Sequence, residues 1–334
     1  MIRLLQQVNW KWRSICLGWL AFLFVMVSNA ACTPNTTTQS STPSPTAECR
    51  MVQHSVGETC VPLNPQRIVV LDNLDGALAL GVKPIAYLGT ADPFLMTHLD
   101  NTEEPVETIG LTETGPNLEA IVRLKPDLIL GMTWHTGESM YQPLSQIAPT
   151  VLVDVDSDGQ WKIPLTKFAE ALGKTAEAEK ILADYSARLA EFKTAMGDRL
   201  DQLTVSILRV YPDALAFYLK NSFPGSILDD AGLKRPPAQA IDRTGQNQQR
   251  IDKELLPMLE ADVMFVWTYG HTKEIAQNAQ TALSQLKTNP LWLALDVVQR
   301  NQVYDVSSYH WLGFGPIAAN LVLDDLFKYL VEGF

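Results

Sequence analysis

Aromatic, histidine and arginine side chains recur at the ends of the apolar segments of this sequence. Arg209 lies inside the apolar segment 205–211, and Tyr211 closes it. A guanidinium group donates to carboxylate or hydroxamate oxygens, and aromatic rings can face the organic part of a bulky ligand. In open α/β sheets, ligands bind beyond the carboxyl ends of the strands. The residues that follow each expected strand are therefore the candidate ligand-binding residues: Tyr87, Trp134, His135, Arg209, Trp267, Tyr269, His271, Tyr309 and Trp311.

Each candidate also has an ordinary structural interpretation. Arg209 could form a surface ion pair, and Tyr87 and Tyr211 are at least as well suited to packing within the fold. Three of the five tryptophans that follow residue 31 belong to the candidate set, which favours a role in lining a cleft.

Three histidines suggest a second kind of site. If His135, His271 and His310 all project into one gap, they could bind a zinc or manganese ion directly. No acidic, histidine-rich loop accompanies them, and the flanking aromatic residues suit a bulky ligand better than a bare cation. Direct metal binding stays open as an alternative.

Motifs of several enzyme classes are missing from the sequence. No G-x-G-x-x-G follows the first strand, and there is neither a P-loop lysine motif nor a G-x-S-x-G elbow. The GFG segment at 313–315 precedes Pro316 and indicates a tight turn into a last helix. The sequence favours a binding protein over an enzyme.

The charge of the chain argues against two classes of partner. The formal net charge is −11, and without the first 31 residues it becomes 23 − 37 = −14. Affinity for nucleic acid comes mainly from cations that neutralise phosphates, and basic patches attract anionic lipid surfaces. We therefore expect neither nucleic acid nor a lipid surface bound through a basic patch.

Short apolar segments alternate with helical patterns in two comparable halves, which predicts an α/β fold of parallel sheets covered on both faces. A Gln-rich segment at 245–250 is expected to be a loop, and residues 253–259 a helix. The expected strands are 67–72, 84–89, 106–109, 127–131 and 150–153 in the first half, and 205–211, 214–219, 262–267 and 302–306 in the second.

Between the halves, residues 165–197 break this rhythm with apolar residues at steps of three or four, a pattern typical of helices. Gly173 divides the stretch, and about 22 helical residues from Thr175 would span roughly 33 Å. This length indicates a rigid strut between two lobes, with an ordinary crossover helix as the alternative.

The first 31 residues have the anatomy of a secretory signal peptide: a basic start, an apolar run from Ile15 to Val27, and small residues before Cys32. This pattern resembles a bacterial lipobox, in which the cysteine is acylated, although Asn29 departs from it. Lipidation at Cys32 is the favoured interpretation, and ordinary secretion stays open. The Ser-, Thr- and Pro-rich residues that follow predict a flexible tether, so that residues 32–48 join anchor and body.

Two further cysteines, Cys49 and Cys60, flank a Val-Gly pair at 56–57 where the chain can turn back. In an oxidising compartment they are expected to form a disulfide. Two unpaired thiols are the alternative. A zinc site with His54 would lack a ligand.

Six segments occur in an order and at distances that resemble one family. The chain resembles the periplasmic binding proteins that deliver iron–siderophore complexes to ABC importers, from about Cys49 to Leu330. The segments are GETCVPLNPQRIVVLD, GPNLEAIVRLKPDLILG, MYQPLSQIAPTVLVD, SFPGSILDDAGLKRP, NPLWLALDVVQRNQVYDV and WLGFGPIAANLVLDDL.

The resemblance implies two Rossmann-like lobes with mainly parallel sheets, joined by one long α-helix, with a ligand cleft between them. The lobes would be residues 49–164 and 198–334, and the linker region 165–197. It further implies a ferric siderophore as ligand, with iron held by the chelate and no cofactor of the protein's own; a corrinoid or haem ligand is an alternative.

The resemblance also implies a partner in transport. Glu119 and Glu254, one in each lobe, would dock the protein onto arginines of an ABC permease dimer. We accordingly expect a monomeric protein of the periplasm that meets the membrane only through its lipid anchor.

Overall fold

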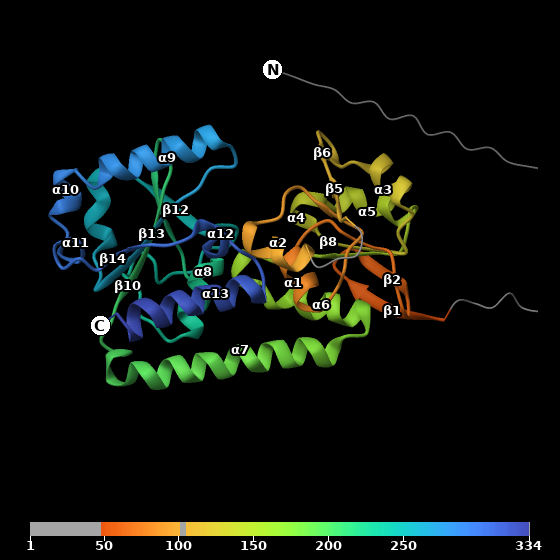
Figure 1. Ribbon diagram of the computed structural model, residues 1–334, viewed down its shortest axis with the longest axis horizontal. Coiled ribbons are helices and arrows are strands. Elements are labelled where there is room, and N and C mark those ends of the chain that lie inside the picture. The colour runs from red at the N-terminus through yellow and green to blue at the C-terminus, as the bar shows by residue number, and fades with distance from the viewer. Residues whose placement is uncertain (1–47, 101–104, 334) are drawn as a thin grey trace, which may run out of the picture. The chain divides into compact units, whose positions relative to one another are not determined.

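Two five-stranded sheets form the framework of the protein, shown in Figure 1. The structure is a computed structural model that describes residues 48–100 and 105–333. We call the elements from β1 to α6 the N-terminal lobe and those from β10 to η5 the C-terminal lobe. Both lobes belong to one compact unit, residues 47–334. The predicted signal peptide (1–31), Cys32 and residues 33–47 of the predicted tether lie outside the described residues.

The N-terminal sheet has the strand order β5-β4-β3-β8-β9, and every strand pair in it is parallel. Three of its strands, β3, β8 and β9, are buried along their whole length, as expected for a parallel sheet that is covered on both faces. The strands are β3 (Ile68–Val70), β4 (Ala86–Leu88), β5 (Glu107–Ile109), β8 (Leu128–Met132) and β9 (Thr150–Val153).

The C-terminal sheet has the order β12-β11-β10-β13-β14 and mixed direction. Strands β10, β13 and β14 run parallel, whereas β11 is antiparallel to both β10 and β12. The expectation of a loop at 245–250 holds for 245–247 and was wrong for 248–250, because Gln248–Ile251 pair with β11 as an edge strand, where polar side chains meet solvent. The strands are β10 (Val205–Val210), β11 (Leu215–Tyr218), β12 (Gln248–Ile251), β13 (Val263–Thr268) and β14 (Val303–Asp305).

Helices and short turns fill the connections of both lobes. In the N-terminal lobe they are α1 (Leu74–Ala79), α2 (Pro93–Leu99), α3 (Leu118–Leu124), α4 (Thr133–Thr136), η1 (Glu138–Met140), α5 (Tyr141–Ser145), η2 (Asp158–Gln160) and α6 (Lys162–Leu172), with a small ladder of β6 (Leu111–Thr112) and β7 (Gly115–Pro116). After α7 come η3 (Gly197–Arg199), α8 (Phe223–Asp230), η4 (Lys253–Leu259), α9 (Lys273–Leu286), α10 (Pro290–Leu293), α11 (Asp296–Gln299), α12 (Ser308–Trp311), α13 (Pro316–Leu326) and the π-helical η5 (Phe327–Val331).

A disulfide-bonded hairpin precedes the N-terminal sheet. Strands β1 (Cys49–His54) and β2 (Gly57–Pro62) pair antiparallel, and the Cys49–Cys60 disulfide links them with a Cα–Cα distance of 5.4 Å. The hairpin buries Val52 and Val61 in the main core and packs against β9 and α6. The predicted disulfide is confirmed.

One long helix connects the lobes, as predicted. Helix α7 (Thr175–Met196) has 22 residues and is drawn in green in Figure 1. It is separated from α6 by Gly173, whose φ of 70° lies in the left-handed region that favours glycine. Its buried residues join a core cluster that includes Val70 of the N-terminal sheet and Ile207 of the C-terminal sheet, so the apolar cores of the two lobes are continuous. Within the described residues, no helix combines the length and apolar character required to cross a membrane.

Candidate ligand-binding site

Strand register places two arginines in one row across the C-terminal sheet. Arg250 on β12 pairs with Ala216 on β11, which in turn pairs with Arg209 on β10. Arg209 also pairs with Trp267 on β13. Because paired residues of neighbouring strands project from the same face of a sheet, both arginines lie on one face with the small Ala216 between them.

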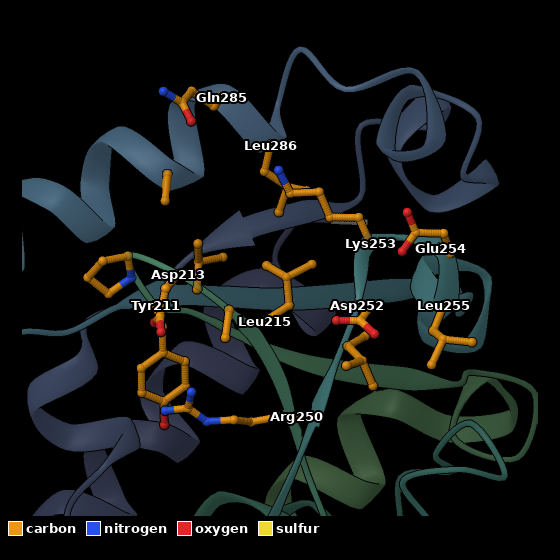
Figure 2. Close-up of a pocket in the computed structure, with 15 residues that line it drawn as sticks. Tyr211, Asp213, Leu215, Arg250, Asp252, Lys253, Glu254, Leu255, Gln285 and Leu286 are labelled. Carbon is orange, nitrogen blue, oxygen red and sulfur yellow. The ribbon is translucent and has the colours of Figure 1, made fainter.

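The phenol ring of Tyr211, which follows β10, contacts both guanidinium groups. The Cζ of Arg209 lies 4.1 Å from the ring centroid and the Cζ of Arg250 lies 4.7 Å from it; Figure 2 shows Arg250 beside this ring. Arg209 is also 5.3 Å from the ring of Tyr269, which follows β13. Such cation–π contacts are worth about 0.5–2 kcal/mol and hold a cation in place without neutralising its charge.

Both arginines keep their positive charge uncompensated. Nη1 of Arg209 donates to the hydroxyl of Tyr218 at 3.2 Å, and its buried Nε has no hydrogen-bond partner. Burial raises the pKa of Tyr218, so this phenol is neutral, although the charge of Arg209 opposes the effect. Within residues 48–100 and 105–333, no carboxylate lies within 4.0 Å of either guanidinium group. This arrangement suits an anionic ligand oxygen as the missing partner.

A cavity of about 470 Å³ opens between the lobes. Trp134 projects into it from the start of α4 and packs against Phe314, with a ring-centroid distance of 5.1 Å. The indole N–H of Trp134 donates to the carbonyl of Val155 at 3.2 Å, which fixes the ring although it is 43 % exposed. The lining segments are Trp134, 156–158, 245–247 and 312–314.

The cavity is joined to the arginine row through consecutive residues of one loop. Tyr211 donates to Oε1 of Gln248 at 2.8 Å, and the neighbouring Asn247 lines the cavity. Asn247 also donates to Oδ2 of Asp158 at 3.0 Å, which ties the C-terminal lobe to η2 of the N-terminal lobe. This loop links Tyr211, and through it Arg209, to a cavity that neither residue lines, and we treat the arginine row and the cavity together as the candidate site.

Asp158 contributes a buried carboxylate at the rim of this site. The residue as a whole is partly exposed, yet its Oδ1 is buried. Burial raises the pKa of Asp158 to about 6, while the hydrogen bonds from Asn247 and from backbone N–H groups act in the opposite direction. Its Oδ2 is held by Asn247, whereas the buried Oδ1 has no hydrogen-bond partner among the described residues.

The carboxylates that follow strands of the N-terminal sheet are likewise occupied by their own lobe. Asp72, after β3, accepts from the backbone N–H of Met132 at 3.2 Å and from the hydroxyl of Thr136 at 3.1 Å. Asp154, after β9, accepts a short hydrogen bond from Thr133. The N-terminal edge therefore offers the site an aromatic ring and no cation from these positions.

Two tryptophans expected to line the cleft are instead part of the core. Trp267 is 2 % exposed and Trp311 is fully buried, and their rings pack 5.5 Å apart. Trp267 also packs on Tyr218, and the indole N–H of Trp311 donates to Asp325 at 2.8 Å. The prediction that their rings face the cleft is corrected: α12 and α13 cover this part of the sheet face, so the indoles fill the space beneath these helices.

The other candidates fall in different surroundings. Tyr87 is buried in a small apolar cluster with Leu95 and Leu99, which matches the packing alternative. Tyr309 is exposed at the start of α12, and His271 is exposed in the loop before α9. His135 lies on α4, and its side chain is outside what the structure describes.

The alternative of a direct metal site finds no support. His310 shares the carboxylate of Asp325 with Trp311, at 2.8 Å from Nε2. Among the side chains that the structure describes, no group of three or more His, Cys, Asp or Glu residues is placed to hold a metal ion. His310 has a structural hydrogen-bonding partner.

Both predicted docking glutamates are exposed in the first turn of a helix. Glu119 follows the N-cap Asn117 of α3, and Glu254 is the second residue of η4. The residues 253–259 were expected to be helical, and they form a 3₁₀ helix with Pro257 inside it. A carboxylate at a helix N-terminus is favoured by the partial positive charge there.

A second hollow of about 520 Å³ lies beside Glu254 in the C-terminal lobe (Figure 2). It is enclosed by residues of β11, β12, η4 and α9, including Leu215, Ile251 and Leu286, which belong to a core cluster separate from the one that contains Trp267. The hollow is confined to one lobe; Tyr211 and Arg250 line it, whereas Arg209 does not. We therefore place the candidate site at the cavity between the lobes.

Sequence reasoning missed Arg250 and Phe314. Arg250 lay in a segment expected to be a loop, so its pairing with β11 was not considered. Phe314 belongs to the GFG segment that was interpreted only as a turn. An aromatic residue between two glycines before a helix is the signal that could have identified it as lining a cavity.

Comparison with known proteins gives a consistent family. The family described as periplasmic binding protein matches residues 96–309. The probable siderophore-binding lipoprotein YfiY of Bacillus subtilis is 35 % identical over 321 residues, which cover 93 % of this chain and 96 % of the relative. The achromobactin-binding periplasmic protein of Dickeya dadantii is 31 % identical and covers 78 % of this chain and 85 % of its own length.

Solved structures show the same architecture. Staphylococcus aureus SirA in complex with staphyloferrin B superimposes with a TM-score of 0.73 at 29 % identity, covering 84 % of this chain and 98 % of SirA. The triscatecholate siderophore-binding protein FeuA of Bacillus subtilis, complexed with ferri-bacillibactin, matches with a TM-score of 0.67 at 23 % identity. At that identity the second likeness concerns the fold alone.

Proposed function

Because this chain belongs to the periplasmic binding protein family, we propose that it is a non-catalytic receptor that captures a ferric siderophore between its lobes and delivers it to an ABC importer. The family consists of substrate-binding proteins, and the names of its relatives here refer to siderophores and ferric chelates. The chelate's own oxygens would hold the iron, so the protein needs no metal ligand.

The observation that carries this proposal is the pair of uncompensated arginines. Arg209 and Arg250 contact one tyrosine ring and have no carboxylate partner among the described residues. The hydrogen bond from that tyrosine to Gln248 links them to the loop that lines a cavity of about 470 Å³ between the lobes. A chain of net charge −11 that leaves two adjacent guanidinium groups unpaired is well suited to an anionic ligand.

The chemistry of the site favours a siderophore with free carboxylate oxygens. A guanidinium fork matches a carboxylate with two parallel hydrogen bonds, whereas the rings of Trp134 and Phe314 can pack against the organic backbone of the chelate. Of the relatives, one protein of Bacillus subtilis is named for Fe(3+)-citrate and one of Escherichia coli for Fe(3+) dicitrate.

For transport, we propose that Glu119 and Glu254 dock the two lobes onto arginines of an ABC permease dimer. Both carboxylates are exposed, one in each lobe, in the first turn of a helix, where an anionic side chain interacts favourably with the helix N-terminus. We further propose a monomer of the periplasm, tethered through acylation of Cys32 after removal of residues 1–31. We propose the domain boundaries expected from the sequence: an N-terminal lobe at 49–164, a linker helix region at 165–197 and a C-terminal lobe at 198–334.

Titration of the purified protein with ferric chelates tests the proposal. Quenching of tryptophan fluorescence reports binding, with Trp134 at the cavity. Replacing Arg209 by Ala removes a charged donor, and hydrogen bonds to charged groups are worth about 1.5–3 kcal/mol, so affinity for a carboxylate chelate should fall by roughly 10- to 100-fold. Arg250→Ala should weaken binding less, because this arginine is more exposed.

Arg123→Ala is the matched control, since Arg123 is an exposed arginine already paired with Glu107 at 2.6 Å. It should leave affinity unchanged. Absence of binding to carboxylate, hydroxamate and catecholate ferric chelates by the wild-type protein would contradict the proposed function. Wild-type affinity in Arg209→Ala would contradict the role of the arginine.

A further inference from the structure

A buried carboxylate of the N-terminal lobe caps the last long helix of the C-terminal lobe. Asp75 in the first turn of α1 accepts hydrogen bonds from the backbone N–H of Ile317 at 2.9 Å and of Ala318 at 2.8 Å. These two groups belong to the first turn of α13, whose N–H groups have no partner within the helix. The contact therefore links residues 242 and 243 positions apart in the chain.

The surroundings of Asp75 are shaped for this contact. Gly315 precedes α13 in extended conformation, and a Cβ at this position would overlap the carboxylate of Asp75. Its lack of a side chain is thus required by the close approach and not by its backbone angles. Pro316, the first residue of α13, has no N–H group that would need a further acceptor.

Fixing the start of α13 also fixes the segment that precedes it. Leu312, Gly313 and Phe314 line the cavity between the lobes, and Phe314 lies three residues before Ile317. The Phe314 ring packs on Trp134, 5.1 Å away between centroids. The hydrogen bonds of Asp75 therefore hold the turn that directly follows one ring of this aromatic pair.

Filling space in the core does not explain why a carboxyl group, and not an apolar side chain, is buried at position 75. Asp75 is 4 % exposed, and among the described residues no basic side chain forms an ion pair with it. Burial raises its pKa to about 7, the N–H groups of Ala318 and Ile317 lower it, and the nearby Asp92 raises it. An apolar side chain would avoid this desolvation cost but would leave two helix N–H groups unpaired.

We propose that Asp75 is a positioning residue of the ligand site: by capping α13 across the junction of the lobes, it holds Phe314 against Trp134 at the cavity. The inference rests on the proposed function where it concerns the ferric chelate, whereas the contact between the two rings can be measured without any ligand.

Two variants and two readouts test the inference. Asp75→Ala removes both hydrogen bonds, and Asp75→Asn keeps one acceptor oxygen for one of the two N–H groups. The fluorescence of Trp134, obtained as the difference between each protein and its Trp134→Phe counterpart without ligand, should shift to longer wavelength as the indole loses its Phe314 contact. Affinity for the ferric chelate that the wild type binds best should fall about tenfold in Asp75→Ala and less in Asp75→Asn, because the site is no longer preorganised.

Asn289→Ala is the control, since Asn289 caps α10 by accepting from Leu291 N–H at 2.8 Å and is not among the residues that line the cavity. It removes a comparable helix cap and should change neither readout. If Asp75→Ala fails to fold, Asp75→Asn and Gly315→Ala are measured in its place. The methyl group of Gly315→Ala would crowd the carboxylate of Asp75.

Unchanged Trp134 emission in the folded Asp75 variants would overturn the inference. Shifted emission with unchanged chelate affinity would overturn it as well, because the ring contact would then have no bearing on binding. Failure of the wild type to bind any ferric chelate would instead contradict the proposed function, and the ligand-free emission of Trp134 would still decide whether Asp75 positions the rings.

Discussion

The carboxyl ends of the two sheets differ in how far the hydrogen-bonding capacity of their charged side chains is used within the protein. At the N-terminal sheet, Asp72 and Asp154 accept hydrogen bonds from Met132, Thr136 and Thr133 of the same lobe. At the C-terminal sheet, Arg209 and Arg250 contact aromatic rings and have no carboxylate partner among the described residues. The carboxylates of one edge are held by hydrogen bonds from their own lobe, whereas the buried Nε of Arg209 at the other edge has no hydrogen-bond partner.

This difference assigns separate tasks to the lobes. An edge whose carboxylates already accept hydrogen bonds from their own lobe can contribute shape and aromatic surface, which Trp134 does. An edge with unpaired guanidinium groups can select a ligand by charge. We infer that recognition of the anionic chelate rests mainly on the C-terminal lobe and that the N-terminal lobe closes the cavity around it.

The antiparallel pairing of β11 explains how Arg250 comes to lie in the same row as Arg209 in the C-terminal sheet. In the N-terminal sheet all strands are parallel. In the C-terminal sheet β11 is antiparallel to β10 and β12, and this register carries Arg250 into the row of Arg209.

The largest expected effect concerns docking to the permease. It asks whether both lobes contribute to docking, although we infer that the C-terminal lobe contributes more to ligand recognition. The double variant Glu119→Ala, Glu254→Ala should abolish uptake of the ferric chelate by cells. The ligand affinity of the purified protein should stay unchanged, because both carboxylates are exposed and neither lines the cavity that contains Trp134. Each single variant should reduce uptake in part. Uptake is measured with radioactive iron in cells that depend on this receptor.

Glu274→Ala is the matched control, since Glu274 is an exposed glutamate in the first turn of α9. Normal uptake by the double variant would disprove the docking proposal. Loss of uptake in only one single variant would show that one lobe carries the docking alone.

A second prediction separates buried from cavity-lining tryptophan. Trp267→Ala should lower the free energy of unfolding by about 4 kcal/mol, because it empties a core position that is 2 % exposed. Trp134→Ala should change stability by less than about 1 kcal/mol and weaken chelate binding instead, since its ring is 43 % exposed. Urea unfolding and fluorescence titration measure the two effects. Equal destabilisation by both variants would remove the distinction.

The smallest expected effect concerns the carboxylate of Asp158 and its pH dependence. Burial raises the pKa of Asp158 to about 6 from its ordinary 3.8, so the folded state binds this proton more tightly than the unfolded chain. The resulting stability is complete below about pH 4 and is lost as the pH rises through 6. Relative to the wild type, Asp158→Asn should therefore gain stability between pH 4 and pH 7, on the order of 2 kcal/mol after allowance for the partial exposure of the residue.

Urea unfolding at pH 4.5 and pH 7 measures this difference. Asp156→Asn, an exposed neighbour, is the control and should show none of it. A gain that is the same at both pH values would mean that the carboxyl group of Asp158 is not held in a raised-pKa environment.

Local pattern was sufficient for most of the framework. Continuous apolar runs such as 127–131 and 150–153 predicted buried parallel strands, and the three- and four-residue steps after Thr175 predicted α7. The spacing of Cys49 and Cys60 around a turn predicted the disulfide of the hairpin. These features depend on periodicity and on contacts between near neighbours in the chain.

The candidate site was predicted only in part, because the position of a residue after a strand does not show whether another element will bury its side chain. Arg209, Trp134 and Tyr269 were identified from their places after strands, and they do lie at the cavity or in the arginine cluster. Trp267 and Trp311 satisfied the same criterion and are buried, because α12 and α13 arrive from residues 308–326 to cover that face.

The sequence by itself determined the alternation of strands and helices, the length of α7 and the family to which the chain belongs, since these follow from residue type and short-range spacing. Only the tertiary structure decided that Arg250 stands in the row of Arg209 and that Asp75 caps a helix 242 residues away. Such pairings arise from the register of strands and the meeting of lobes. They depend on burial and geometry between segments that no local pattern connects.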